Sequence, residues 1–444
     1  MGYFRSRLRG TGNLHCNQET QVTPIFLPTA GPKWTMLSSH RAWLLQQADN
    51  LLSFFEKRSL NRLGGFHELD MEGRPQSPGV PPDSRPGRYL HATTRMVHCF
   101  AIAYLLGRPG ADVFIDHAME FLWKGHRDSM RGGYFWGVGY EAPVDATKQA
   151  YGHAFVLLAA ASAKVIGHPD ADRLLNDISG VLSEHFWEEQ VGAVAEEFTS
   201  DWQPLSNYRG QNSNMHLTEA LMAAFEATSD GNYLRMAERI ADLIIRRHAP
   251  EHNWRVPEHF TGNWQLDRNF SGNPVFRPYG TTPGHSLEWS RLLLQLWELG
   301  RRRLSWLPEA SRNLFDSAVR DGWDTQNGGF YYTLEWDGTP RVRDRYWWPC
   351  CEGIGAAYFL ETIENDSLYE GWYRKIWNFT AARFVDKFNG GWYPQLGADQ
   401  MPSMGPFYGK IDLYHALQAC IIPLLSTTGS ITRGLITAGV KLQL

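Results

Sequence analysis

Cysteine is scarce and unpatterned in this 444-residue chain. Five cysteines are present, an odd number, and no two of them are spaced as C-x-x-C. Disulfide scaffolds and zinc modules need paired or regularly spaced cysteines. This usage is typical of a reduced, intracellular protein, so we expect a cytoplasmic location.

Long apolar runs and blocks of like charge are also missing. The longest apolar run, 154–163, is too short to cross a bilayer. The formal net charge is −4 and no segment concentrates one sign. The sequence therefore predicts neither a nucleic-acid partner nor a membrane partner. It leaves both a monomer and a homo-oligomer open.

Two common catalytic motifs are absent as well. The chain has no glycine-rich phosphate loop and no G-x-S-x-G nucleophile turn, so nucleotide chemistry and serine hydrolysis are not indicated. Residues 1–35 show no helical period and no apolar stretch long enough for a signal peptide. We expect them to be a poorly structured leader, with Met36 as an alternative start.

The chain does contain a repeat. Amphipathic segments alternate with more apolar, alanine-rich segments, and each amphipathic one is followed by a turn with glycine or asparagine and aromatic residues. These turns predict short strands or hairpins. They recur at intervals of about 60–75 residues, and their markers are Gly65, Gly133, Gly192, Trp254, Gly329 and Gly391.

The apolar segments predict helices that are buried on most sides. Their expected bounds are Leu90–Leu106, Lys148–Ile166, Asn214–Thr228, Gly284–Leu299, Pro349–Ile363 and Asp412–Leu424. Six such helices inside six amphipathic ones predict an all-α fold, a single (α/α)6 barrel with short β-hairpins in its loops. A superhelical solenoid is the alternative, but it needs polar capping repeats that the ends lack. We expect the barrel to span 36–430, followed by a C-terminal tail at 431–444.

In such a barrel the inner helices run in one direction, so their starts meet at one end. These starts carry Arg95, Lys148, Tyr151, His153, Asn212, His216, Glu219, His285, Glu288, Trp347, Trp348, Glu352, Asp412, Tyr414 and His415. One histidine on an apolar helix is usually a hydrogen-bonded core residue. Three at equivalent places, with several acids and an arginine nearby, indicate an active site.

Several chemistries fit this set of residues. His216 and Glu219, or His285 and Glu288, have the one-turn spacing of metal ligands, although we expect no metal. Glu288 and Glu352 could instead hydrolyse a glycoside. Imidazoles are the most prominent groups, however, and they titrate near neutrality. Two histidines facing one another across a cavity suit a 1,2-proton transfer next to a carbonyl.

Five blocks of sequence resemble a known family. They are KQAYGHAF (148–155), NSNMHLTEA (212–220), PGHSLEW (283–289), WWPCCEGIG (347–355) and GKIDLYHALQA (409–419). In this order they are similar to the N-acylglucosamine 2-epimerase superfamily. The closing D-x-Y-H-A form is most similar to its aldose–ketose isomerase branch, the mannose and sulfoquinovose isomerases. The resemblance covers roughly 35–425 and implies an (α/α)6 barrel.

The resemblance implies roles for individual residues. His285 and His415 would be the catalytic pair that moves a proton through a cis-enediol, and His216 would assist opening of the pyranose ring. The positions that hold sugar hydroxyls or tune the histidines would be Arg95, Tyr151, Asn212, Glu288, Trp347, Glu352 and Gln395. The implied partner is a small-molecule monosaccharide, and no metal or other cofactor is implied.

Two departures bear on the substrate. Ile411 stands where the sulfoquinovose pattern has glutamine, and His91 stands where it has tryptophan. A neutral aldohexose such as mannose is therefore expected, with the ketose as product. The alternatives are a sugar 2-epimerase of the N-acylglucosamine, cellobiose or mannose type, a sulfoquinovose isomerase, a barrel glycoside hydrolase and a non-catalytic binding scaffold.

Overall fold

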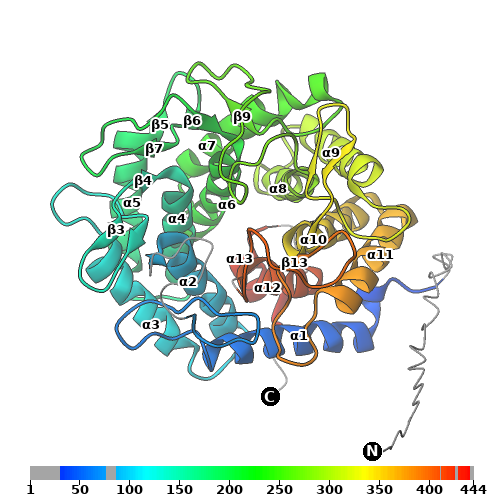
Figure 1. The fold of residues 1–444 in the computed structure, drawn as a ribbon, viewed down its shortest axis with the longest axis horizontal. Helices are drawn as coiled ribbons and strands as arrows, with labels where there is room; N and C mark the ends of the chain where they lie inside the picture. Colours follow the sequence, from blue (N-terminus) through cyan, green and yellow to red (C-terminus); the bar gives the residue numbers. More distant parts are fainter. Residues whose placement is uncertain (1–30, 77–86, 411, 426–428, 441–444) are drawn as a thin grey trace, which may run out of the picture.

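The computed structural model describes residues 31–76, 87–410, 412–425 and 429–440. Residues 1–30 of the predicted leader, Ile411, and positions 441–444 of the predicted tail lie outside these ranges. The described residues form a ring of helices that surrounds a second, inner ring (Figure 1).

Six helices of the described chain form the inner ring. They are α2 (Leu90–Leu105), α4 (Ala150–Val165), α6 (Gln211–Thr228), α8 (Pro283–Leu299), α10 (Trp347–Glu364) and α12 (Tyr414–Ile421). Each packs against the next, and α12 packs against both α10 and α2, which closes the ring. The predicted (α/α)6 barrel and its inner helices are thus confirmed, and the open solenoid is excluded.

The outer layer consists of helices that each pack against an inner one, and α7 and α9 each contact two inner helices. They are α1 (Ser38–Glu56), α3 (Ala111–Phe121), α5 (Ala171–Val181), α7 (Gly231–Ala241), α9 (Trp306–Gly322) and α11 (Ser367–Arg383). The buried residues of α7, Leu234, Ala237, Ile240 and Ala241, lie on one face, as the helical period requires. Three outer helices continue into a π-helical turn, at Leu122–His126, Leu182–Phe186 and Asp242–Arg246.

The inner helices are buried all round. In α4 every residue from Ala150 to Ala163 is buried, and alanines make up much of that stretch. Small side chains let neighbouring backbones approach closely, while the larger ones fill the space between helices. Burying one aliphatic side chain of the leucine or valine kind contributes about 1.5–3 kcal/mol. The apolar character that distinguished these segments in the sequence therefore reflects their central position.

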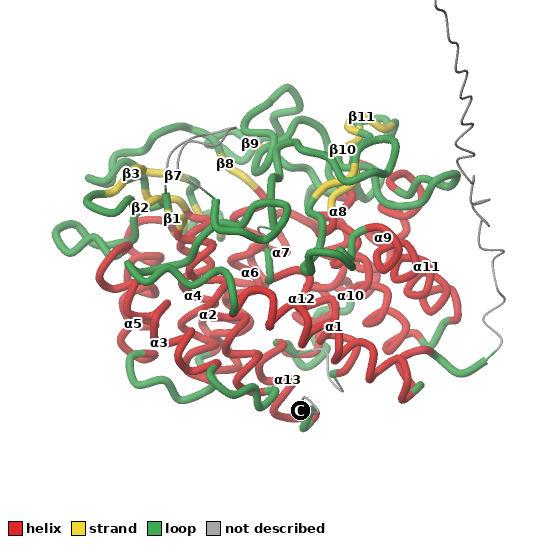
Figure 2. Tube along the Cα trace, turned by 60° about the horizontal axis from the view of Figure 1, so that its bottom comes forward, coloured by secondary structure: helices red, strands yellow, loops and turns green. Residues whose placement is uncertain are grey.

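The loops at one end of the barrel contain short antiparallel strands (Figure 2). The paired strands are β1 (Arg88–Tyr89) with β2 (Gly137–Val138), β2 with β3 (Pro143–Asp145), β4 (Lys148–Gln149) with β7 (Glu197–Phe198), β5 (Trp187–Glu188) with β6 (Ala193–Val194), β8 (Arg209–Gly210) with β9 (His259–Phe260), β10 (Thr333–Leu334) with β11 (Pro340–Val342), and β12 (Arg345–Tyr346) with β13 (Gln395–Leu396). The predicted glycine turns close with bridges such as Arg127–Tyr134 and Val385–Trp392. At the fourth turn the chain forms a 3-10 helix, Ala249–His252, instead.

A buried ion pair ties three of these turns to the inner helix that follows. Asp128 accepts hydrogen bonds from the backbone amides of residues 130 and 131, and its other oxygen lies 2.8 Å from Nζ of Lys148, just before α4. Asp324 pairs with Arg345 before α10, and Asp386 with Lys410 before α12, in the same way. These ion pairs thus fix the starts of α4, α10 and α12 over the turns that precede them.

The opposite end of the barrel is covered by a further helix. α13 (Ile431–Ala438) falls in the segment expected as a tail and packs against α2, α4 and α6 (Figure 2). Two hydrogen bonds fix the chain just before α13. Gln295 donates to the carbonyl of Gly429, and Glu226 accepts from the amide of Ser430. Within the described ranges, no helix is both long and apolar enough to cross a membrane.

We expect the ion pair of Asp128 and Lys148 to contribute to the thermal stability of the protein. Lys148 is fully buried, so Asp128→Ala leaves its ammonium without a counter-charge and with only the carbonyl of Gly132 to accept from it, which typically costs about 3–5 kcal/mol. We expect a clear drop in the midpoint of thermal unfolding, followed by circular dichroism. Glu120→Ala, which breaks the exposed pair with Lys124, is the control and should leave the midpoint nearly unchanged. Equal midpoints for the two variants would contradict a structural role for the buried pair.

Candidate active site

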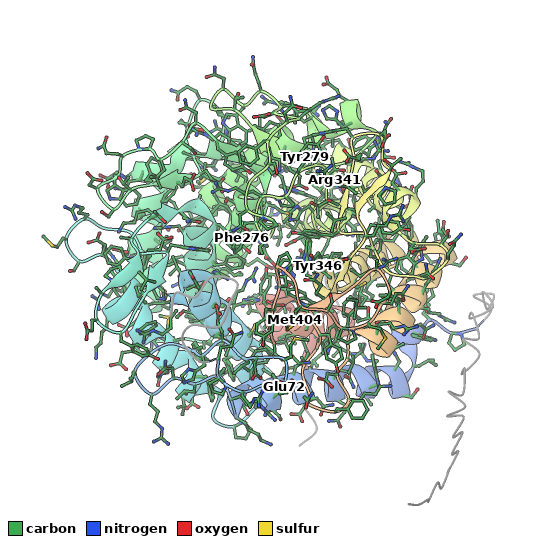
Figure 3. The ribbon with its side chains drawn as sticks, in the orientation of Figure 1. Glu72, Phe276, Tyr279, Arg341, Tyr346 and Met404 are labelled. Carbon is green, nitrogen blue, oxygen red and sulfur yellow. The ribbon has the colours of Figure 1, made fainter. Side chains whose placement is uncertain are left out.

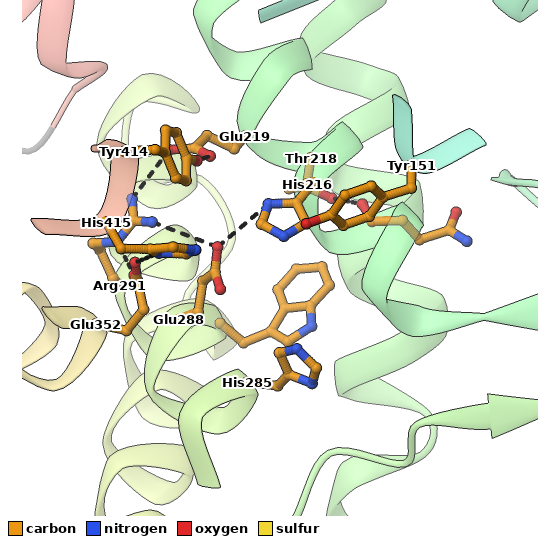
Figure 4. Close-up of polar contacts among 12 residues, drawn as sticks. Tyr151, His216, Thr218, Glu219, His285, Glu288, Arg291, Glu352, Tyr414 and His415 are labelled. Carbon is orange, nitrogen blue, oxygen red and sulfur yellow. Dashed lines mark hydrogen bonds and ion pairs between the residues drawn. The ribbon is translucent and has the colours of Figure 1, made fainter. Parts of the chain in front are cut away.

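Three imidazoles from three inner helices converge inside the mouth of the barrel. The ring centroids of His216 on α6 and His415 on α12 are 6.5 Å apart. The indole of Trp348 contacts both His285 and His415. Its ring centroid is 5.0 Å from that of His285 on α8 and 5.9 Å from that of His415. Gly284 permits this packing, because a Cβ there would collide with the indole. The three histidines thus lie close together (Figure 4).

His285 is held by a carboxylate that comes from a loop. Nδ1 of His285 lies 2.8 Å from Oε2 of Glu258, which also accepts hydrogen bonds from the side chain of Gln211 and the amide of Thr282. Burial alone would raise the pKa of Glu258, but the contact with His285 outweighs it and holds the pKa below its usual range. A carboxylate can only accept a hydrogen bond, so Nδ1 of His285 is the donor in this contact.

His415 is held in the same way by Glu352. Nδ1 of His415 lies 2.8 Å from Oε1 of Glu352, whose other oxygen accepts from Nε of Arg291 at 2.8 Å. Glu352 is buried, yet Arg291 and His415 lower its pKa below the usual range. Asp412 accepts from the backbone amide of His415 and fixes the start of α12. His285 and His415 therefore share one arrangement, in which Nδ1 contacts a buried carboxylate.

His216 differs from the other two. Its Nδ1 lies 3.5 Å from Oε1 of Glu288, and neither buried atom has a hydrogen-bond partner. Glu219 lies close by, so that one ligand-type atom from each of these three residues falls within 4.8 Å of the others. The guanidinium of Arg291 already faces Glu219 at 3.5 Å and Glu288 at 3.8 Å. A divalent cation would stand beside that positive charge, so the group is a poor fit to a metal site.

Most of the predicted substrate-binding residues lie around the three histidines. Arg95 donates to the hydroxyl of Tyr151 and lies 3.4 Å from Asp412. Trp347 donates from Nε1 to Asp412 and lies 6.3 Å from the ring of His415. The ring of Tyr151 meets His216 edge-on at 5.1 Å. Arg95, Tyr151, Trp347, Glu288 and Glu352 are thus brought together with the histidines.

Asn212 contacts the loop that carries Phe276. Its side chain donates to the carbonyl of Phe276, whose ring packs against Tyr151 at 5.3 Å and against His91 at 5.8 Å. Phe276 and Tyr346 lie near the middle of the ring in Figure 3. The ring of His91 is stacked on Trp136 at 4.9 Å. Burial, reinforced by Arg95, holds the pKa of His91 well below its usual range, so this wall of the mouth is aromatic and uncharged.

Gln395 is turned toward a neighbouring strand. It lies on β13, which pairs with Tyr346 just before α10, and its amide nitrogen donates to Asp344 at 2.7 Å. Gly405 packs against the amide, while Oε1 is buried without a partner. The contacts in the described structure tie Gln395 to the loop layer rather than to an imidazole.

Neither Glu258 nor Arg291 was identified from the sequence, whereas Trp348 was among the residues expected at the mouth of the barrel. Glu258 comes from a loop with no helical period, far from the start of α8. A signal was present, since Val256-Pro257-Glu258-His259-Phe260 repeats the pattern Val194-Ala195-Glu196-Glu197-Phe198 one unit earlier. In both units the central glutamate is buried and contacts a side chain in the first turn of the following inner helix, His285 for Glu258 and Ser213 for Glu196. Arg291 lies a full turn beyond Glu288, and its role depends on neighbours from other helices.

The chain is similar to several known proteins. A model of the N-acylglucosamine 2-epimerase family matches residues 64–419. A D-mannose isomerase from Pseudomonas cannabina pv. alisalensis is 40% identical over 407 residues, covering 90% of this chain and 96% of that protein. A crystal structure of a D-mannose isomerase superposes with a TM-score of 0.80 at 32% identity, covering 89% of this chain and 99% of that one. A cellobiose 2-epimerase from Dictyoglomus turgidum is 24% identical over 402 residues, covering 84% of this chain and 95% of that protein.

Other buried histidines serve the fold. His153, at the start of α4, accepts from the amide of Tyr134 and contacts the carbonyl of Gln149 through Nδ1. Burial lowers the pKa of His153 and of His98 to about 3, and that of His126 to about 4. These imidazoles stay neutral in the folded protein, whereas the unfolded chain protonates them below a pKa of about 6.5.

This difference predicts acid sensitivity. The unfolded state binds more protons than the folded state between pH 6.5 and about 4, so the free energy of unfolding should fall as pH falls through that window. Urea unfolding at pH 7.5, 6.5, 5.5 and 4.5 measures the slope. His153→Gln should lower the slope by about one proton, whatever its effect on stability at neutral pH. A flat profile of wild-type stability from pH 6.5 to 4.5 would refute the prediction.

Proposed function

Because this chain belongs to the N-acylglucosamine 2-epimerase family, we propose that it is an aldose–ketose isomerase that interconverts a free aldohexose of the mannose type and its ketose. The relatives at 40% identity are named D-mannose isomerases, whereas the named epimerases are more distant. The observation that carries the proposal is the matched pair of His285 and His415, each with Nδ1 bound to a carboxylate.

The proposed reaction uses these two imidazoles as a base pair. Nε2 of one histidine takes the proton from C2 of the open-chain aldose, and the electrons of that bond form the C1–C2 double bond of a cis-enediol as O1 gains a proton. Loss of the O2 proton then forms the C2 carbonyl while C1 receives a proton. General acid–base groups of this kind typically contribute about 10²–10⁴-fold each. The chemistry needs no cofactor.

The mouth supports a neutral sugar over an anionic one. The charge of Arg95 is already met by Asp412, and its guanidinium lies over the rings of Phe155 and Tyr414 at 4.4 and 4.7 Å. The neighbouring wall of His91, Trp136 and Phe276 offers no further cation for a sulfonate or phosphate. Aromatic faces of this kind suit the C–H faces of a hexose.

We propose further that residues 36–430 are the catalytic domain of a cytoplasmic enzyme, with a leader at 1–35 and a tail at 431–444 that continues the barrel through α13. The four cysteines in the described ranges are free and buried, as a reducing compartment allows. Monosaccharides are the proposed binding partners.

One incubation tests the activity directly. Mannose, glucose, fructose and sulfoquinovose are each incubated with the protein in D2O, and products and C–D formation are followed by NMR. We expect mannose and fructose to interconvert, with deuterium entering at the carbon that receives the proton. Formation of only the C2 epimer would replace the proposal with a 2-epimerase, which returns the proton to C2 from the other face. Reaction of sulfoquinovose alone, or of none, would also overturn it.

The carboxylate behind His285 supplies a sharper test of mechanism. Glu258→Gln places an amide donor next to Nδ1, so the imidazole carries its proton on Nε2 and loses its basic nitrogen. We expect kcat to fall by roughly 10²–10⁴-fold with the circular dichroism spectrum unchanged, as for His285→Ala and His415→Ala. Glu335→Gln, whose carboxylate pairs with Arg341 in an outer loop, is the matched control. Near wild-type turnover in Glu258→Gln would remove His285 as a base.

A further inference from the structure

The contact of His216 with Glu288 has no parallel at the other two histidines. His285 and His415 each place Nδ1 at 2.8 Å from a carboxylate oxygen that other donors also engage. His216 Nδ1 and Glu288 Oε1 are 3.5 Å apart, and both are buried without a partner. His216 cannot swing away, since its ring is packed between Tyr151 and Phe155 at 5.1 and 4.7 Å. A small shift of the Glu288 side chain would close the gap to a hydrogen bond.

Charge compensation around Arg291 decides the state of Glu288. Three carboxyl groups face this one guanidinium, at 2.8 Å for Glu352, 3.5 Å for Glu219 and 3.8 Å for Glu288. Glu352 is also held by His415, and Glu219 accepts a hydrogen bond from Tyr414. Glu288 is 1% exposed and has only the two long contacts. It is therefore the carboxyl whose negative charge is least compensated.

Burial and the charges around Glu288 and His216 together favour the neutral form of both groups. Burial, reinforced by Glu352 and Glu219, raises the pKa of Glu288 well above its usual range, although Arg291 and Arg95 oppose the shift. Burial, with the positive charge of Arg95 and the nearby imidazoles His415 and His285, holds the pKa of His216 well below its usual range. A neutral carboxyl can give its O–H to Nδ1 of a neutral imidazole, and the imidazole proton then lies on Nε2.

We propose that Glu288 is held as the neutral acid and donates its proton to Nδ1 of His216, so that His216 presents an Nε2–H group to a bound sugar while His285 and His415 present lone pairs. The site then holds two bases and one acid built from the same side chain. The protonation state of the carboxyl behind each imidazole sets the difference. Glu288 is a positioning residue that acts through His216.

The role of this acid rests on the proposed isomerase function. Opening a pyranose breaks the C1–O5 bond, and O5 must gain a proton as the O1 hydroxyl loses one. His216 gives its Nε2 proton to O5 and receives the Glu288 proton at Nδ1, so the imidazole stays neutral throughout. The O1 proton goes to a basic imidazole, and the bond electrons of O1–H form the carbonyl. Glu288 is left as a carboxylate beside Nη2 of Arg291, a buried donor that lacks a hydrogen-bond acceptor.

Nitrogen NMR tests the protonation pattern without any sugar. In protein labelled with ¹⁵N-histidine, assigned with single histidine variants, we expect the proton of His216 on Nε2 and those of His285 and His415 on Nδ1 at pH 7.5. Glu288→Gln retains a donor for Nδ1 and should keep the His216 pattern, whereas Glu288→Leu should lose it. Glu352→Gln, the same change on the other side of Arg291, should leave His216 unchanged and move the His415 proton to Nε2. A proton on Nδ1 of His216 in the wild type, or on both nitrogens, overturns the proposal.

Mutarotation of α-mannopyranose, followed by polarimetry, tests the proton supply. Glutamine cannot release a proton, so Glu288→Gln should lose enzyme-catalysed mutarotation by about 10²–10⁴-fold even though its His216 pattern is intact. Wild-type mutarotation in Glu288→Gln would show that Glu288 supplies no proton and would refute that step. Failure of the isomerase function appears separately, as mutarotation and the NMR pattern without any ketose.

Discussion

A single guanidinium, that of Arg291, balances the acidic centre of this barrel. It is fully buried on α8 and faces carboxyl groups from α6, α8 and α10. Moving several carboxylates out of water without a counter-charge would cost several kcal/mol per ion. Because one cation cannot serve three acids equally, the groups differ. Glu352 is the tightly held anion, Glu219 is shared with Tyr414, and Glu288 is left with long contacts only.

This unequal sharing of Arg291 explains how histidine side chains in one site can serve both as bases and as an acid. An imidazole whose Nδ1–H is bound by an anion exposes a lone pair, whereas an imidazole whose Nδ1 accepts a proton exposes an N–H group. Glu258 and Glu352 produce the first state at His285 and His415. The neutral acid that we infer at Glu288 produces the second at His216. The chemistry of the site thus depends on the partners of the histidines as much as on the histidines.

The repeat supplies the rigidity that these short contacts need. Buried pairs such as Asp128 with Lys148 and Asp386 with Lys410 fix the starts of inner helices over their turns, and functional side chains lie in the first turns of those helices. α13 covers the end of the barrel opposite the loops (Figure 2). Function and fold therefore share the same end of each helix, with structural pairs outside and catalytic groups inside.

The sequence by itself determined the ring and the segments that face its centre, because apolar periodicity and the glycine turns are local and recur in every unit. It also indicated His216, His285 and His415, because each opens an inner helix. It did not reveal which acid serves which histidine. The spacing of His285 and Glu288 places them on one face of α8, yet Glu258 from a distant loop binds His285, and Glu288 turns to His216 on α6. Only tertiary structure decided these partners, because a carboxyl group's charge depends on every neighbour within a few ångströms, and here those neighbours come from different helices.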